Sequence, residues 1–123
     1  MEKNQLWAKN APVLLLAVAT QNFGHNGKPS RWGQYDTGAA VMSLCLQAVA
    51  LGLCVHQMGG YDADKARVLF QIPDDCTPMA MIAVAYQTDV SFLADEFRAG
   101  EIADRSRSAL GERFFAGSWG ESV

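Results

Sequence analysis

The sequence has few of the residues that build metal centres or nucleophilic catalytic sites. It contains two histidines and three cysteines among 123 residues. Cys45, Cys54 and Cys76 form no CxxC pair. Because structural zinc sites use closely spaced cysteine and histidine ligands, this pattern predicts no metal site. The odd number of cysteines, two of them inside apolar runs, favours reduced thiols and a cytoplasmic protein.

Signals for export, membrane insertion and nucleic-acid binding are also lacking. No basic segment precedes the apolar run at residues 13–19, so we expect no signal peptide. The apolar run at residues 38–53 is shorter than the roughly 20 residues that span a bilayer. It also contains Ser43 and Gln47, which favours a buried helix over a membrane span. The net charge of −3 disfavours nucleic acid as a partner.

Apolar residues are abundant, at 50% of the chain, and predict one folded domain over residues 1–123. Uninterrupted apolar runs predict strands covered on both faces. The expected elements are a short helix at 3–10, a strand at 12–20, a loop at 21–35, a helix at 38–53, a strand at 53–57, a helix at 63–70 capped by Asp62, a strand at 78–86 and a helix within 89–103. This order predicts an α/β (α+β) sandwich, a small central sheet flanked by helices.

The helix at residues 38–53, which Asp36 or Thr37 would cap, is apolar almost all round. One small sheet covers only one side of such a helix, so its other side needs a second cover. We expect a copy of the same helix from a second subunit, in an obligate homodimer. Residues 105–123 predict an extended tail with late aromatic side chains, which we expect to pack on the partner subunit.

Four stretches carry a family resemblance in their order and spacing. They are residues 4–19, residues 35–40 with the helix that follows, residues 57–62, and Arg105 and Arg107 followed by the aromatic tail. Together they resemble the nitroreductase family of FMN-dependent NAD(P)H oxidoreductases. The resemblance implies the nitroreductase-like sandwich with its long helix at a dimer interface. Family members carry an additional N-terminal segment of two helices with an arginine-rich FMN-phosphate motif. That segment has no counterpart here, so we expect a shortened member or a piece of a longer protein.

The resemblance implies two groups of cofactor-binding residues. They are Gln57, Met58, Gly59 and Gly60 at the flavin ring, and Arg105 and Arg107 at the FMN phosphate. The backbone N–H of Gly59 would point at N5, the atom that accepts hydride. Glycine lets the backbone approach a flat ring closely and adopt φ > 0, and arginine binds phosphate through charge-assisted hydrogen bonds. The alternatives are an ordinary tight turn and two solvated arginines.

No catalytic residue is predicted, because hydride transfer through a flavin needs no protein nucleophile. His56 is expected to be a half-buried strand residue. The resemblance implies an enzyme in which NAD(P)H reduces FMN, and FMN passes electrons to a nitroaromatic, quinone or similar small-molecule acceptor. The alternative is a flavin-free truncated homologue, a small dimeric ligand-binding or scaffold protein. The absent N-terminal segment favours this alternative, whereas Gly59, Gly60, Arg105 and Arg107 favour the enzyme.

Overall fold

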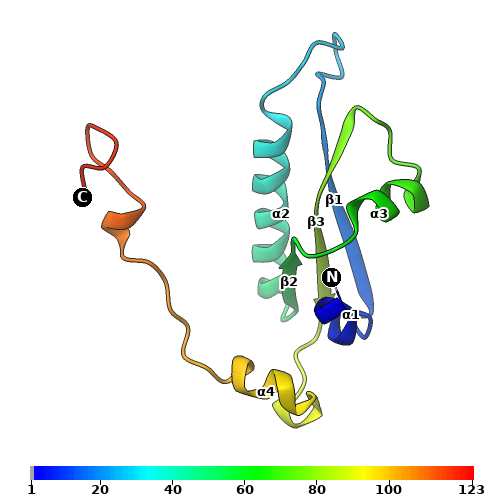
Figure 1. The fold of residues 1–123 in the computed structure, drawn as a ribbon, viewed down its shortest axis with the longest axis vertical. Coiled ribbons are helices and arrows are strands. Elements are labelled where there is room, and N and C mark those ends of the chain that lie inside the picture. Colours follow the sequence, from blue (N-terminus) through cyan, green and yellow to red (C-terminus); the bar gives the residue numbers. More distant parts are fainter. Residues whose placement is uncertain (1) are drawn as a thin grey trace. The chain divides into compact units, whose positions relative to one another are not determined.

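The computed structural model describes residues 2–123, with the side chains of residues 3–123, and the chain divides after Gln87 into two compact units. The first, the core unit, contains α1 (Glu2–Ala8), β1 (Val13–Thr20), α2 (Gly33–Ala50), β2 (Cys54–Met58), α3 (Ala63–Phe70) and β3 (Cys76–Ala85). The second, the C-terminal unit, contains the 3-10 turn Val90–Phe92, α4 (Asp95–Glu101) and the 3-10 turn Leu110–Glu112. Figure 1 shows the path of the chain, and the predicted order of elements is confirmed.

The core unit is built on a three-stranded antiparallel sheet in the order β1-β3-β2. The register aligns Leu15, Ile82 and Gln57 in one row across the sheet. Neighbouring residues of a strand point to opposite faces, so the adjacent row of Leu16, Met81 and Met58 faces the other way. The long helix α2 covers the first face, and α1 and α3 lie on the second (Figure 1).

The two long strands differ in how deeply they are buried. The central strand β3 contains Ile82, which is 2% exposed. Strand β1 lies at an edge of the sheet, where Val13, Leu14 and Leu15 are 45%, 43% and 36% exposed, and only Ala17 and Ala19 are buried. The prediction that β1 is covered on both faces is therefore wrong for the first half of the strand. Within the described residues, the chain leaves these side chains partly exposed.

Helix α2 begins earlier than its sequence predicts. Its first residue is Gly33, and neither Asp36 nor Thr37 caps it, because both lie inside the helix. The Thr37 hydroxyl donates to the Gly33 carbonyl oxygen at 2.7 Å. The helix starts at Gly33 because this residue packs directly against the Thr20 carbonyl at the end of β1, a position with no room for a Cβ atom.

Helix α2 ends at Ala50 rather than Leu53. Gly52 follows with a left-handed φ of 76°, and the Leu53 N–H donates back to the Ala48 carbonyl at 2.9 Å. This backbone pattern closes helices whose last carbonyls would otherwise lack donors. It turns the chain into β2, so the Gly59–Gly60 pair ends a strand and not the long helix.

Only one side of α2 is covered within the chain. The helix packs on β1 and β2, where Ala48 is buried. On its other side Met42, Leu46 and Val49 are 49%, 62% and 65% exposed. The prediction of a single covered side is confirmed, and a second subunit as the other cover stays a prediction. Among residues 2–123 no helix is long and apolar enough to cross a membrane.

Helix α3 begins and ends where its sequence predicts, with its first residue after Asp62 and its last at Phe70. The Asp62 carboxylate accepts from the Lys65 N–H at 2.9 Å and caps the first turn. After Phe70, the Arg67 guanidinium donates to the carbonyl oxygens of Pro73 at 2.6 Å and Cys76 at 2.7 Å. These charge-assisted bonds hold the end of α3 to the beginning of β3.

In the C-terminal unit, the helix predicted within residues 89–103 is interrupted. The Asp89 side chain accepts from the Ser91 N–H at 2.8 Å and starts a 3-10 turn, and α4 follows only at Asp95. Farther along, Phe115 pairs with Ser122 in an isolated β-bridge, and the Phe115 and Trp119 rings lie 5.1 Å apart. Trp119 is 93% exposed, and its packing on a partner subunit stays a prediction.

The contact between Gly33 and Thr20 predicts a large cost for one methyl group. We expect Gly33→Ala to lower the free energy of unfolding by about 1–3 kcal/mol, because the added Cβ forces β1 and α2 apart. Gly24→Ala, in the same connection, adds a Cβ that meets nothing within 4 Å of the described chain and should change stability by less than about 0.5 kcal/mol. Urea unfolding of both variants measures the difference, and equal stabilities would contradict the close approach.

Candidate cofactor site

The four predicted flavin-ring residues lie at the end of β2 and in the turn that follows, but they face two ways. Gln57 points to the α2 side, where its amide contacts the Cys45 sulfur at 3.4 Å. Met58 points to the opposite side, is 5% exposed, and packs with Ala8 and Ala83. Because these two side chains lie on opposite faces of the sheet, a ligand bound on one face can contact only one of them.

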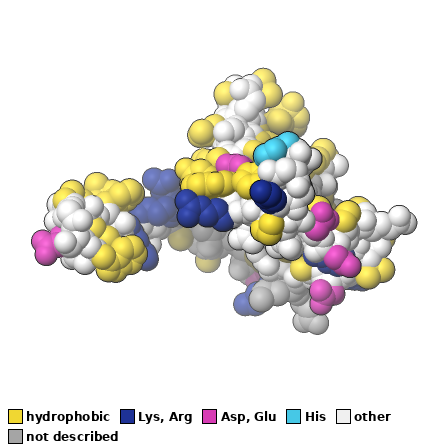
Figure 2. Space-filling model, turned by 90° about the horizontal axis from the view of Figure 1, so that it is seen from above, with side chains coloured by type: hydrophobic (Ala, Val, Ile, Leu, Met, Phe, Trp, Pro, Cys, Tyr) yellow, Lys and Arg dark blue, Asp and Glu magenta, His cyan; other side chains and the backbone are white. Residues whose placement is uncertain are grey.

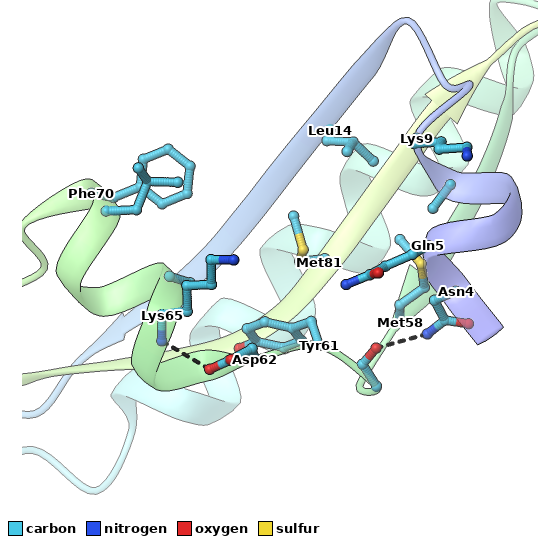
Figure 3. A pocket seen from close by; sticks show the side chains of 14 residues that line it. Asn4, Gln5, Lys9, Leu14, Met58, Tyr61, Asp62, Lys65, Phe70 and Met81 are labelled. Atoms are coloured by element: carbon cyan, nitrogen blue, oxygen red, sulfur yellow. Dashed lines mark hydrogen bonds between the residues drawn. The ribbon is translucent and has the colours of Figure 1, made fainter. Parts of the chain in front are cut away.

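The glycine pair is fixed by hydrogen bonds of its backbone. The Gly60 carbonyl accepts from the Asn4 side-chain amide at 2.9 Å (Figure 3). The Gly59 carbonyl accepts from the Tyr61 N–H at 3.1 Å. Gly59 does not use the positive φ that glycine allows, because its backbone lies outside the left-handed region. A Cβ at Gly59 would meet no atom of the described chain within 4 Å. The backbone at Gly59 is therefore open to approach from outside the chain.

A pocket of about 440 Å³ lies beside the turn, between α1, α3 and the sheet (Figure 3). Its floor is formed by Leu14, Met58 and Met81, from all three strands. Gly60 also lines it, whereas Gln57 and Gly59 do not. Of the four predicted flavin-ring residues, Met58 and Gly60 therefore line the pocket, and Gln57 and Gly59 do not.

Polar groups surround the mouth of this pocket. Gln5 and Lys9 come from α1, and Tyr61 and Lys65 come from the turn and α3. In Figure 3 the side chains of Gln5 and Lys65 extend toward the middle of the pocket from opposite walls. Burial raises the pKa of the Tyr61 phenol above its ordinary value, because the charged phenolate loses solvent there.

The predicted phosphate-binding arginines belong to the other unit of the chain. Arg105 and Arg107 are exposed residues of the C-terminal unit, whereas the turn belongs to the core unit. The Arg107 guanidinium donates to the neighbouring Ser106 carbonyl at 2.7 Å. A single site made of the turn and the two arginines therefore stays a prediction.

Sequence reasoning missed Asn4, whose amide contacts Gly60 although 56 positions separate them. The available signal was its place on the same face of α1 as buried Ala8, four residues on. His56 lies in a strand as predicted, but it is exposed rather than half-buried because β2 is an edge strand, and its ring contacts Trp7 edge-on at 4.8 Å. The three cysteines are free, and residues 2–123 contain no group of three or more metal-ligating side chains.

Comparison with known proteins decides the family. The sequence model of the nitroreductase family matches residues 1–86. The chain belongs to the nitroreductase family. This confirms the resemblance seen in the sequence, and solved structures confirm the α/β sandwich fold. A structure described as an oxidoreductase containing FMN superposes with a TM-score of 0.87 at 38% identity, over 97% of this chain and 61% of that one.

Two other relatives are more distant. A nitroreductase family protein from Clostridium difficile 630 gives a TM-score of 0.63 at 20% identity, over 89% of this chain and 61% of that one, and shows the fold alone. An uncharacterized 15.4 kDa protein of Mycolicibacterium smegmatis is 29% identical over the whole of this chain and 82% of its own length. The chain spans about three fifths of the length of the two solved structures described above.

The burial of Tyr61 predicts a change at alkaline pH. Burial favours the neutral phenol in the folded state and so raises the pKa of Tyr61. The contribution of this phenol to folding stability is therefore complete below pH 10.0, the ordinary pKa, and is lost as pH rises through the pKa of the folded state. The part of the phenolate absorbance that the parent shows and Tyr61→Phe lacks should rise with a midpoint above pH 10.0. The variant should also lose less stability than the parent at alkaline pH.

Tyr86→Phe removes a phenol that is 76% exposed and serves as the control for this measurement. It should keep the alkaline stability profile of the parent. A Tyr61 difference spectrum centred at or below 10.0 would show that the phenol is not buried in solution.

Proposed function

We propose that the protein is an FMN-dependent oxidoreductase of the cytoplasm, in which NAD(P)H reduces FMN and FMN reduces a nitroaromatic, quinone or similar small acceptor. The observation that carries this proposal is the 38% identity and TM-score of 0.87 to an oxidoreductase that contains FMN. The match of residues 1–86 to the nitroreductase family supports it independently of any one relative.

The residues of the turn fit the demands of a flavin ring. A flat ring needs backbone without side chains in its way, and Gly59 offers this because the space beyond its Cα is open in the described chain. Asn4 restrains Gly60 through its carbonyl and so fixes the direction of the turn. When bound, FMN supplies the atom that accepts and donates hydride. The Gly59 N–H would donate to that atom, and Arg105 and Arg107 would hold the phosphate.

The apolar surface of the core unit supports a homodimer as the working form. Met42, Leu46 and Val49 on α2 and the first residues of β1 are exposed within one chain. Hydrophobic side chains are visible at the surface of the molecule in Figure 2. Large exposed apolar patches mark interfaces in folded proteins. A second copy, with the aromatic tail at residues 110–120 packed on it, would cover this surface and border the flavin.

Bound flavin is the first test of the proposed activity. The purified protein should absorb blue light after incubation with FMN and dialysis. The double variant Arg105→Ala with Arg107→Ala should bind FMN at least about tenfold more weakly, because charge-assisted bonds contribute roughly 1.5–3 kcal/mol each. Quenching of FMN fluorescence measures the affinities.

Arg113→Ala is the control: it removes an arginine of the same unit, whose guanidinium donates to the Ser108 hydroxyl at 3.3 Å, and it should leave FMN affinity unchanged. Equal affinity of the double variant and the parent would remove the phosphate assignment. A protein that stays colourless after FMN addition and dialysis would favour the alternative of a flavin-free, dimeric ligand-binding or scaffold protein.

The dimer is tested by charges placed on the exposed side of α2. Leu46→Asp and Val49→Asp alter side chains that are 62% and 65% exposed in one chain, so their effect on a lone chain should be small. Each should dissociate the dimer, because an unpaired carboxylate would be buried at the interface. Val68→Asp, at a residue of α3 that is 79% exposed, should leave the mass unchanged. Light scattering at micromolar concentration reports the mass, and a monomeric parent would refute the dimer.

A further inference from the structure

The pocket between α1 and α3 has the composition of a ligand site in its own right. Its volume of about 440 Å³ falls in the range of about 300–1,000 Å³ typical of small-molecule sites. Leu14, Met58 and Met81 form an apolar floor, and Phe70 forms part of the wall beside α3. Methionine sulfur makes favourable contacts with aromatic rings, so this floor suits a flat aromatic body.

The polar groups of the pocket favour a negative charge on such a ligand. Two of its lining residues, Lys9 and Lys65, are basic, and one, Asp62, is acidic. The Asp62 carboxylate, whose Oδ1 accepts from the Lys65 N–H at the first turn of α3, offsets one of these two positive charges. The lining therefore carries a surplus of positive charge. Figure 3 shows the Lys65 side chain and the Gln5 amide extending toward the middle of the pocket from opposite walls, and both groups are hydrogen-bond donors.

We propose that this pocket binds an aromatic carboxylate, with its ring on Met58 and Met81 and its carboxylate between Lys65 and Gln5. The pocket is distinct from the backbone assigned to flavin N5, because Gly59 does not line it, although Met58 and Gly60 of the same predicted group do. The two sites share the turn, since Met58 and Gly60 line the pocket and Gly60 is bonded to Asn4. The proposal requires no flavin, so it is tested on the protein alone.

A pair of probes that differ only in charge tests the recognition of the carboxylate. We expect 2-naphthoate to bind about tenfold more tightly than the neutral 2-naphthamide, because only the first offers charge-assisted bonds. Protein with carbon-13 methionine methyl groups localises the ligand by NMR. The Met58 and Met81 methyl signals should shift on titration, and the signal of Met42, on α2, should not.

Variants identify the groups that recognise the charge. Lys65→Met should remove most of the preference for 2-naphthoate, and Gln5→Leu should reduce it. Lys28→Met, a lysine outside the pocket, should preserve it. If Lys65→Met fails to fold, Gln5→Leu and the two probes on the parent protein still decide the question. Equal affinity for the two probes, an unchanged preference in both pocket variants, or shifts at Met42 in place of Met58 and Met81 would each overturn the proposal.

A competition experiment separates this site from flavin binding. Saturating FMN should leave the 2-naphthoate shifts at Met58 and Met81 in place. Displacement of 2-naphthoate by FMN would overturn the proposal of a second site, because the pocket would then belong to the flavin position. Failure of FMN to bind at all would remove the proposed activity while the response to 2-naphthoate stands, so the two failures are distinguishable.

Discussion

The pairing of β3 between β1 and β2 is the constraint on which the rest of the core unit depends. A strand with partners on both edges has one register with each, and this register decides which residues share a face. The row containing Met81 and Met58 becomes the floor of the pocket, and the row containing Ile82 and Gln57 lies under α2. A shift of β2 by one residue would exchange Met58 and Gln57, and the pocket would lose its apolar floor.

The small size of this sheet also explains the exposed apolar surface. With three strands, two of them are edges, and one helix layer on each face cannot cover them all. The start of β1 and the outer side of α2 remain exposed for this reason. Burial of apolar area is the main favourable term in folding, at roughly 25 cal/mol per Å². A second protein chain packed on this exposed apolar surface would therefore add stability that a single chain lacks.

Features set by near neighbours in the sequence were predictable, and features set by distant contacts were not. Helix α3 occupies the residues expected of it because Asp62 caps it within three positions. The start of α2 was misplaced because it depends on Gly33 meeting the Thr20 carbonyl across a loop. The Asn4–Gly60 bond joins residues 56 positions apart, and the place of Asn4 on the buried face of α1 does not identify its partner. The assignment of Gly59 to the flavin comes from the family resemblance and stays a prediction. Within the described chain Gly59 has no positive φ, and the place of its absent Cβ is open space.

The turn after β2 is where the two proposed binding events meet. Strand alternation sends Met58 into the pocket, and one residue farther Gly59 presents its backbone away from it. Gly60 returns to the pocket wall, and its carbonyl is held by Asn4 of α1. A ligand in the pocket would therefore press on the residues that flank Gly59, and a ring against Gly59 would restrain the residues that line the pocket. Because linkage between two sites is reciprocal, any change that one ligand makes in the affinity of the other must appear in both directions.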